Sequence, residues 1–348
     1  MRGAVILRNQ EKVEVRDFDD PTPGHGQVVL KVMASSICGS DLRAIYRRDA
    51  KAADPAEEYR GVICGHEPAG RITAVGPGVR RFRVGDRVAI YHVAGCGVCR
   101  SCREGALISC ESVGASYGYQ RNGGMGEYLL ADEASCIPLP DELSYEDGAI
   151  VACGGGTAYE ALLRADVSGR DRVFITGLGP VGLAVGLMAQ KMGVELVIGV
   201  DTSPERVEIA KKIGAITAGT GASPAEALEF VREKTHGELC EATFDCSGAT
   251  AARTLALRGT RRWGRSHMVG AGGRLEIDLD ELLLFKQLTV RSHWVTTPGH
   301  MEDLCHLLAR WKLNLDRMVT DRLSLEEADK AFAIANSGRA GKVCVVAP

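Results

Sequence analysis

The sequence has 348 residues, of which 45% are hydrophobic and 25% charged, and this length and composition suit a globular protein of two domains. A formal net charge of −3 gives no electrostatic basis for binding nucleic acid or an anionic membrane. No apolar stretch approaches the ~18 residues of a membrane span, and the apolar run after Met1 is too short for a signal peptide. We therefore expect a cytoplasmic protein whose partner is a small molecule.

Short β-type segments separated by Pro and Gly fill the first part of the chain. The alternation of apolar and polar residues predicts strands over Ala4–Leu7, Val13–Arg16, Val28–Val32, Arg71–Val75 and Asp86–Tyr91. Strands of this kind favour a barrel-like domain. The charged residues 46–61 between them are interpreted as a solvated loop, with a lid or a subunit contact as the alternative.

Three separate stretches carry residue types that bind metals. Cys38 lies in Ile37–Asp41, His66 and Glu67 are adjacent, and Cys153 precedes three glycines. A lone His-Glu pair is usually solvated or hydrogen-bonded, so each stretch by itself is weak evidence. Two thiolates and one imidazole, with a fourth position open, are the ligands that a catalytic zinc needs. Spacing alone does not join Cys153 to the other residues.

Four cysteines in one short segment give a stronger signal. Their spacing, C-x2-C-x2-C-x7-C, is typical of a closed tetrahedral site for structural zinc, and the residues are Cys96, Cys99, Cys102 and Cys110. A [4Fe–4S] cluster and free core thiols are the alternatives, but no proline follows the last cysteine. We interpret the other cysteines outside the two proposed zinc sites as small core residues.

The pattern changes to alternating strands and helices after the glycines at 154–156, which we interpret as a break in the chain and a hinge. A buried strand over Val173–Thr176 leads into Gly177-Leu178-Gly179-Pro180-Val181-Gly182 and an apolar helix over Leu183–Met192. The next strand, Leu196–Val200, is followed by Asp201. A G-x-G-x-x-G segment in this context is a dinucleotide fingerprint, because its glycines let the backbone approach a pyrophosphate at the helix N-terminus.

The rest of the chain continues the alternation. Ser203-Pro204 and Ser223-Pro224 are typical of helix starts, and Ser324 with Glu327 forms a predicted capping box. Further strands are expected over Ala242–Asp245, His267–Gly270, Leu288–Val295 and Lys342–Val346, and helices over Met301–Trp311 and Ser324–Ala335. Three histidines are interpreted as structural rather than as acid–base groups: His92, His267 and His293.

Together these motifs resemble the zinc-dependent medium-chain alcohol dehydrogenase family, in the family's order and nearly from end to end. The resemblance implies an α/β fold with a chaperonin-10-like β-barrel catalytic domain over 1–152 and 296–348. A structural zinc lobe at about 95–111 belongs to that domain. A doubly wound parallel-sheet (Rossmann) domain that binds NAD is implied over 153–295, with a cleft between the domains. Two zinc ions per chain follow, one catalytic and one structural.

The resemblance also assigns roles at the catalytic zinc. Cys38, His66 and Cys153 are implied as its ligands, and Glu67 as a close neighbour or alternative ligand. Asp41 resembles the carboxylate that hydrogen-bonds the ligating histidine and fixes its tautomer. Ser40 is expected to take the proton of the substrate hydroxyl while hydride passes to nicotinamide.

Cofactor choice depends on two further positions. Asp201 is expected to bind the ribose hydroxyls and to repel a 2′-phosphate, which favours NAD over NADP, and Arg206 is a further expected cofactor contact. In many family members a histidine three residues after the Ser40 position ends the proton path, but this sequence has Arg43 there. An arginine cannot act as a base near neutral pH. We expect Arg43 to contact a cofactor phosphate, with an exposed structural arginine as the alternative, and the proton to leave through solvent, Glu67 or His92.

Three functions remain open at this point. The residues around Cys38 and His66 look like the sorbitol and threonine dehydrogenase branches, which favours a secondary alcohol, polyol or amino alcohol, or the corresponding ketone, as substrate. Cys153 favours a primary-alcohol dehydrogenase, since the polyol branch often has a carboxylate there. A non-catalytic binding module of the same fold is the third possibility. By analogy with the family, the strand at Leu288–Val295 predicts a homodimer or homotetramer.

Overall fold

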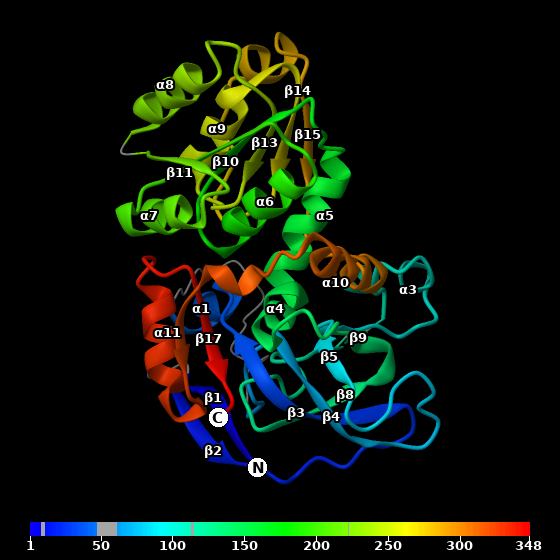
Figure 1. Ribbon diagram of the computed structural model, residues 1–348. Helices are drawn as coiled ribbons and strands as arrows, with labels where there is room; N and C mark the ends of the chain where they lie inside the picture. Colours follow the sequence, from blue (N-terminus) through cyan, green and yellow to red (C-terminus); the bar gives the residue numbers. More distant parts are fainter. Residues whose placement is uncertain (8–10, 47–60, 113–114, 222) are drawn as a thin grey trace. The chain divides into compact units, whose positions relative to one another are not determined.

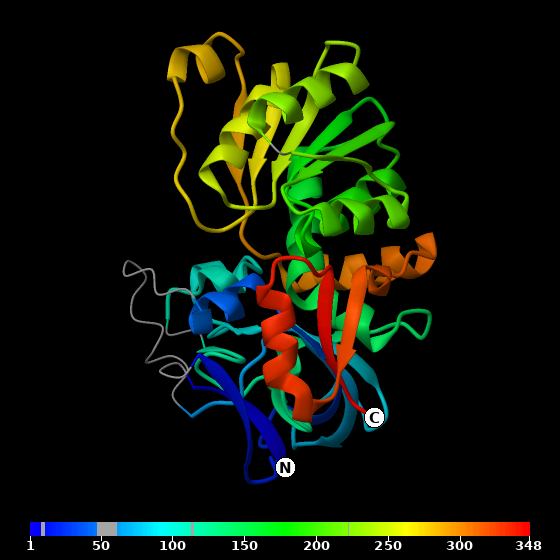
Figure 2. The same ribbon diagram turned by 90° about the vertical axis from the view of Figure 1, so that its left-hand side faces the viewer.

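The computed structural model describes residues 1–7, 11–46, 61–112, 115–221 and 223–348. The chain forms two compact units (Figures 1 and 2). Unit 1 contains Met1–Gly156, Thr296–Ser337 and Lys342–Pro348, and unit 2 contains Thr157–Val295 and Gly338–Gly341. The predicted domain boundaries differ in giving 153–156 to the second domain and 338–341 to the first, and they stay a prediction. Most of the predicted loop at 46–61 lies outside the described residues.

A seven-stranded sheet is the centre of unit 1, in the order β16-β17-β3-β4-β5-β9 with β8 paired to β3. Apolar residues on alternating positions of these strands form its core, among them Leu30, Ile72 and Ile90. The strands are β3 (Gln27–Ser36), β4 (Pro68–Val75), β5 (Arg87–Ile90), β8 (Tyr128–Asp132), β9 (Cys136–Pro138), β16 (Val319–Leu323) and β17 (Lys342–Val346). Because β17 pairs antiparallel with β3, the last strand of the chain lies beside the first part of the barrel.

Smaller elements complete unit 1. Two small antiparallel sheets have two strands each: β1 (Arg2–Leu7) with β2 (Lys12–Asp17), and β6 (Val93–Ala94) with β7 (Ala115–Ser116). The α-helices are α1 (Gly39–Tyr46), α3 (Arg100–Arg103), α4 (Tyr145–Ile150), α10 (Pro298–Trp311) and α11 (Ala328–Asn336). The predicted capping box of Ser324 and Glu327 is confirmed. No helix in the described part of the chain has the length and apolar character needed to cross a membrane.

The predicted break at residues 154–156 is wrong, because the chain stays helical there. Helix α4 continues into a π-helical turn, η4 (Val151–Gly155), and then into α5 (Gly156–Ala165). The glycines serve close packing instead of a bend. A Cβ atom on Gly156 would lie 2.7 Å from the side chain of Thr296, and one on Gly155 would lie 3.1 Å from that of Leu315.

Unit 2 is a six-stranded parallel sheet in the order β12-β11-β10-β13-β14-β15. The strands are β10 (Arg172–Thr176), β11 (Leu196–Asp201), β12 (Thr217–Thr220), β13 (Cys240–Asp245), β14 (Thr260–Met268) and β15 (Thr289–Ser292). Helices α6 (Pro180–Lys191) and α7 (Pro204–Ile213) cover one face, and α8 (Pro224–Lys234) and α9 (Thr250–Gly259) the other (Figure 1). The strand order reverses between β10 and β13, so the doubly wound prediction is confirmed.

Two strand predictions in unit 2 need correction. The strand predicted over His267–Gly270 is β14, which starts at Thr260 and ends at Met268. Gly270 lies beyond it and packs against the loop at Gly248, where a Cβ on Gly270 would lie 2.2 Å from the Gly248 nitrogen. β15 ends at Ser292, since Val295 has a φ of +62° that is not compatible with a strand. The predicted N-caps Ser203 and Ser223 are confirmed, each accepting a backbone hydrogen bond from the first helical turn.

Candidate active site and metal centres

Strand pairing assembles the first metal-ligand set. Cys38 follows β3 and His66 with Glu67 precedes β4, and these strands are antiparallel neighbours. Cys153 reaches the same place from the π-helical turn η4. The ligand atoms of Cys38, His66, Glu67 and Cys153 all lie within 4.8 Å of one another.

The sulfur spacing fits a shared metal ion. The Sγ atoms of Cys38 and Cys153 are 4.0 Å apart. Two thiolates on one tetrahedral zinc, each bound at about 2.3 Å, lie about 3.8 Å apart, whereas a disulfide joins its sulfurs at about 2.05 Å. The set therefore matches a zinc site rather than a disulfide.

Asp41 orients two of these ligands. Its carboxylate accepts a hydrogen bond from His66 Nδ1 at 3.0 Å and another from the Cys38 backbone N–H at 2.9 Å, as predicted for His66. A carboxylate only accepts, so the His66 proton sits on Nδ1 and Nε2 offers its lone pair to a metal. Burial opposes a charge on the ring, but Asp41 and Cys38 outweigh it and raise the pKa of His66 well above its usual value.

Glu67 is held by a buried ammonium that sequence reasoning missed. Lys342 Nζ lies 2.5 Å from Glu67 Oε2, both side chains are at most 2% exposed, and Ser36 Oγ donates to the same oxygen. Glu67 raises the pKa of Lys342, while burial raises that of Glu67 to about 7 against the pull of Lys342. The other oxygen, Oε1, has no hydrogen-bond partner among the described residues. A buried oxygen of this kind beside two thiols and an imidazole fits a site for a cation.

Ser40 and two rings surround His66. Ser40 Oγ lies 3.5 Å from His66 Nε2, which places this hydroxyl beside the expected metal-binding atom. The ring centroids of His92 and Tyr119 are 5.1 Å and 5.2 Å from that of His66. Arg43 is half-buried in the last turn of α1, and its expected phosphate contact stays a prediction.

The four-cysteine lobe forms the second candidate metal site. The sulfurs of Cys96, Cys99, Cys102 and Cys110 also lie within 4.8 Å of one another, with Cys96 and Cys102 3.9 Å apart. These short distances between the sulfur atoms fit four ligands of a single metal ion, whereas a four-iron cluster needs its cysteine sulfurs further apart. Backbone N–H groups of Cys99 and Val98 lower the pKa of Cys96 to about 6, which favours the thiolate that zinc binds.

The glycine segment of unit 2 has the geometry of a dinucleotide loop. Gly177 has a φ of +94°, and a Cβ on Gly182 would lie 2.0 Å from the Gly177 carbonyl oxygen. Gly179 is the N-cap of α6 and Pro180 is at its start. Gly186 packs against Ile216, since a Cβ there would lie 2.4 Å from that side chain.

Asp201 holds this loop from the end of β11. Its carboxylate accepts hydrogen bonds from the backbone N–H groups of Leu178 at 2.7 Å and Ser203 at 2.8 Å. Arg206 Nη1 lies 3.9 Å from the same carboxylate, and its Nε donates to the carbonyl oxygen of Ala340 at 3.3 Å. Asp201 and Arg206 are thus adjacent at the glycine loop.

His267 and His293 form a buried pair in unit 2. His267 Nδ1 and His293 Nε2 are 2.7 Å apart, and the remaining nitrogen of each ring is buried without a partner among the described residues. Burial lowers the pKa of His267 to about 3 and that of His293 to about 4. Both rings are therefore neutral, as expected for structural histidines.

This pair predicts a loss of stability in acid. As the pH falls below about 6.5, an unfolded histidine takes up a proton that folded His267 excludes, so the free energy of unfolding should fall by about 2 kcal/mol between pH 6.5 and 5. Urea unfolding of the wild type and of His267→Gln across this range measures the difference. Equal slopes for the two proteins would contradict the prediction.

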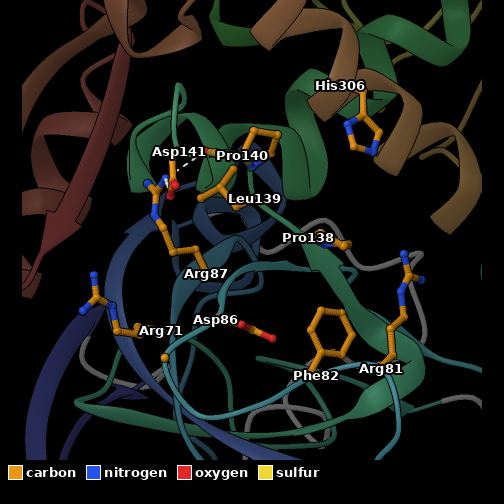
Figure 3. A pocket seen from close by; sticks show the side chains of 11 residues that line it. Arg71, Arg81, Phe82, Asp86, Arg87, Pro138, Leu139, Pro140, Asp141 and His306 are labelled. Atoms are coloured by element: carbon orange, nitrogen blue, oxygen red, sulfur yellow. Dashed lines mark hydrogen bonds and ion pairs between the residues drawn. The ribbon is translucent and has the colours of Figure 1, made fainter.

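A pocket of about 630 Å³ in unit 1 is separate from the metal ligands (Figure 3). Arginines contribute much of its lining, and two of them already have an ion-pair partner: Arg87 with Asp141 at 3.3 Å, and Arg81 with Glu302. None of the predicted catalytic residues lines it. We therefore do not assign it to the substrate.

Comparison with known proteins relates this chain to zinc-type dehydrogenases. Residues 24–141 match a family described as alcohol dehydrogenase GroES-like domain, which confirms the predicted barrel, and residues 180–310 match one described as zinc-binding dehydrogenase. The chain is 46% identical to YphC, an uncharacterised zinc-type alcohol dehydrogenase-like protein of Escherichia coli (strain K12), with 99% of this chain and 98% of that protein covered.

Relatives with named substrates are more distant. L-threonine 3-dehydrogenase of Pyrococcus abyssi is 32% identical (95% of this chain, 94% of that protein), and sorbitol dehydrogenase of Bacillus subtilis is 31% identical (94% and 92%). Among solved structures, 2R,3R-butanediol dehydrogenase from Bacillus subtilis superposes with a TM-score of 0.86 at 26% identity, with 100% of both chains covered.

Proposed function

The chain belongs to the zinc-dependent medium-chain alcohol dehydrogenase family, and from this premise we propose that it transfers hydride between NAD and a secondary alcohol, polyol or amino alcohol. The observation that carries the proposal is the ligand set of Cys38, His66 and Cys153 on the same chain as the glycine loop held by Asp201. Threonine, sorbitol and butanediol each have a secondary hydroxyl next to a second polar group. We propose that the substrate shares this feature.

The residues present fit both groups that such a reaction requires. When bound, zinc lowers the pKa of an alcohol as a Lewis acid, and NAD accepts hydride. Cys38, His66 and Cys153 would hold the zinc, and Asp41 fixes the His66 tautomer that this needs. Ser40 places a hydroxyl 3.5 Å from His66 Nε2, where it would receive the substrate proton.

A screen of NAD reduction tests the proposed substrate class. Matched pairs such as 2,3-butanediol with 2-butanol, and threonine with 2-butanol, ask whether a neighbouring polar group raises kcat/KM. We expect at least a tenfold preference for the substrates with the second polar group, which corresponds to about 1.4 kcal/mol. Higher activity on primary alcohols would favour a primary-alcohol dehydrogenase instead. If protein that contains two zinc ions per chain reduces no NAD with any of these alcohols, both dehydrogenase functions are contradicted.

Ser40→Ala is expected to lower kcat by roughly 10²-fold, the usual scale for losing a positioned proton-transfer group. Arg43→Ala should instead raise KM for NAD and leave the shape of the pH–rate profile unchanged, because an arginine cannot act as the base. Turnover measured against pH for both variants separates the two roles. Loss of a pH-dependent limb in Arg43→Ala, with unchanged NAD affinity, would place Arg43 in the proton path.

We expect NAD to be preferred over NADP by at least tenfold in kcat/KM, because the Asp201 carboxylate repels a 2′-phosphate. Asp201→Asn removes the charge and retains an acceptor for one backbone N–H group, so this ratio should fall. Arg206 stays beside the same position and offers a positive charge to the phosphate. The kcat/KM values for both cofactors measure the effect, and equal use of both by the wild type would show that the assignment is wrong.

We further propose that two or more copies associate through the edge of the unit 2 sheet, in the cytoplasm. β15 ends this sheet, and large apolar side chains near it are exposed, including Trp294 at 75%, Trp263 at 69% and Phe285 at 63%. Exposed edges and apolar side chains of this size favour pairing with a second chain. Light scattering on wild type and Trp294→Glu tests this, and a wild-type monomer would contradict it.

A further inference from the structure

His92 contacts two aromatic rings beside the first metal-ligand set. It lies between β5 and β6 and is 6% exposed. Its ring stacks on Tyr91 with a centroid distance of 5.7 Å and meets the His66 ring edge-on at 5.1 Å. Its backbone carbonyl accepts a hydrogen bond from Tyr117 N–H at 2.9 Å. A ring held in this way has little freedom to turn.

The His92 ring makes one hydrogen bond to the turn that carries Cys153. Nδ1 lies 3.2 Å from the carbonyl oxygen of Ala152. A carbonyl only accepts, so the proton is on Nδ1 and the ring donates.

Ala152 precedes Cys153 within the π-helical turn η4. Such turns shift the helical pattern to i→i+5 bonds and are rare within α-helices, and here a donor from another segment adds a contact to the local backbone. The other ligands are oriented differently. Asp41 bonds the backbone N–H of Cys38 and the ring of His66.

We propose that His92 is a positioning residue for the metal ligand Cys153, because its hydrogen bond to Ala152 fixes the turn from which the Cys153 thiolate reaches the metal. The ligand set is then oriented by two side chains: Asp41 for Cys38 and His66, and His92 for Cys153. This inference rests on the zinc site of the proposed function. It assigns to His92 a role in metal geometry rather than in proton transfer.

The test compares zinc retention in matched variants. His92→Phe keeps an aromatic ring and removes the donor, whereas His92→Asn places an amide donor near the Nδ1 position. Tyr91→Phe is the control, since it removes a different buried hydrogen bond of the same stack, from Tyr91 Oη to Thr296 O at 2.8 Å. Chelator competition measures the loss of each zinc, and the four-cysteine site serves as an internal reference.

We expect His92→Phe to lose catalytic-site zinc at a 10–100-fold lower chelator concentration, the usual scale for removing a residue that orients a ligand. The four-cysteine site should be unchanged. His92→Asn should restore most of the affinity, and Tyr91→Phe should lower thermal stability without this loss. In protein loaded with cobalt at the catalytic site, the thiolate-to-cobalt absorption band should shift in His92→Phe alone.

Several outcomes would overturn the inference. Wild-type zinc retention and an unshifted cobalt band in His92→Phe would do so, as would equal zinc loss in His92→Phe and Tyr91→Phe. If His92→Phe does not fold, His92→Gln takes its place, because its longer side chain puts the amide away from the Nδ1 position. Wild-type protein that binds zinc only at the four-cysteine site would overturn the proposed function as well, so the two failures are distinguishable.

Discussion

Cys153→Ser is expected to lower kcat by roughly 10³-fold or more while the protein stays folded. Serine keeps the size of the side chain but replaces a soft thiolate with a poor zinc ligand, so the Lewis acid that stabilises the developing charge is lost or misplaced. Elemental analysis should then give about one zinc per chain, against two in the wild type. The measurement is turnover together with zinc content on the same preparation.

Cys99→Ser is the matched control, because it removes one thiolate from the other site. A closed structural zinc site contributes folding energy, so we expect the free energy of unfolding to fall by more than about 3 kcal/mol. Any protein that remains folded should keep its catalytic zinc. Iron with visible absorbance, or a single zinc in the wild type, would refute the model of two separate zinc sites.

Lys342→Met should be the most damaging substitution of a residue that is not itself a candidate metal ligand. It leaves Glu67 buried without its ion-pair partner, and breaking a buried pair from one side costs about 3–5 kcal/mol. The exposed pair of Lys330 with Glu327, at 3.1 Å, provides the control: Lys330→Met should cost at most about 1 kcal/mol. Urea unfolding of both variants measures the contrast.

The effect of Lys342→Met should depend on pH. Without the ammonium, the pKa of Glu67 rises above its value of about 7 in the folded wild type. The variant then holds a proton that the wild type releases, so the stability gap between them widens as the pH increases above 7. Glu67→Gln in the Lys342→Met background should recover part of the loss. If the difference in free energy of unfolding between the wild type and Lys342→Met is constant from pH 6 to 9, Glu67 is not the group that loses its ion-pair partner.

Motifs that are local in the chain were predictable from the sequence. The four-cysteine segment and the glycine loop each place their functional groups within a few residues, so spacing and turn chemistry determine them. The N-caps Ser203 and Ser223 and the capping box at Ser324 were predictable for the same reason, because a cap bonds to its own first turn. The doubly wound sheet followed from the alternation of strands and helices.

Periodicity was less reliable where glycines were involved. Gly154, Gly155 and Gly156 suggested a break, yet they lie in a continuous helical stretch that packs closely against Thr296 and Leu315. A glycine permits either a bend or a close approach. The neighbours that distinguish these alternatives, Thr296 and Leu315, lie far along the chain from these glycines and are known only from the tertiary structure.

By itself, the sequence determined which residue types this protein has for binding zinc and a dinucleotide, because those motifs are short and their chemistry is local. Only the tertiary structure decided which distant residues act together. In the sequence, Lys342 was only the first residue of a predicted strand, and His92 was one of three histidines interpreted as structural. Pairing of β17 with β3 and the path of the turn at Cys153 bring Lys342 to Glu67 and His92 to Ala152. Such contacts depend on the packing of whole elements, which no local spacing specifies.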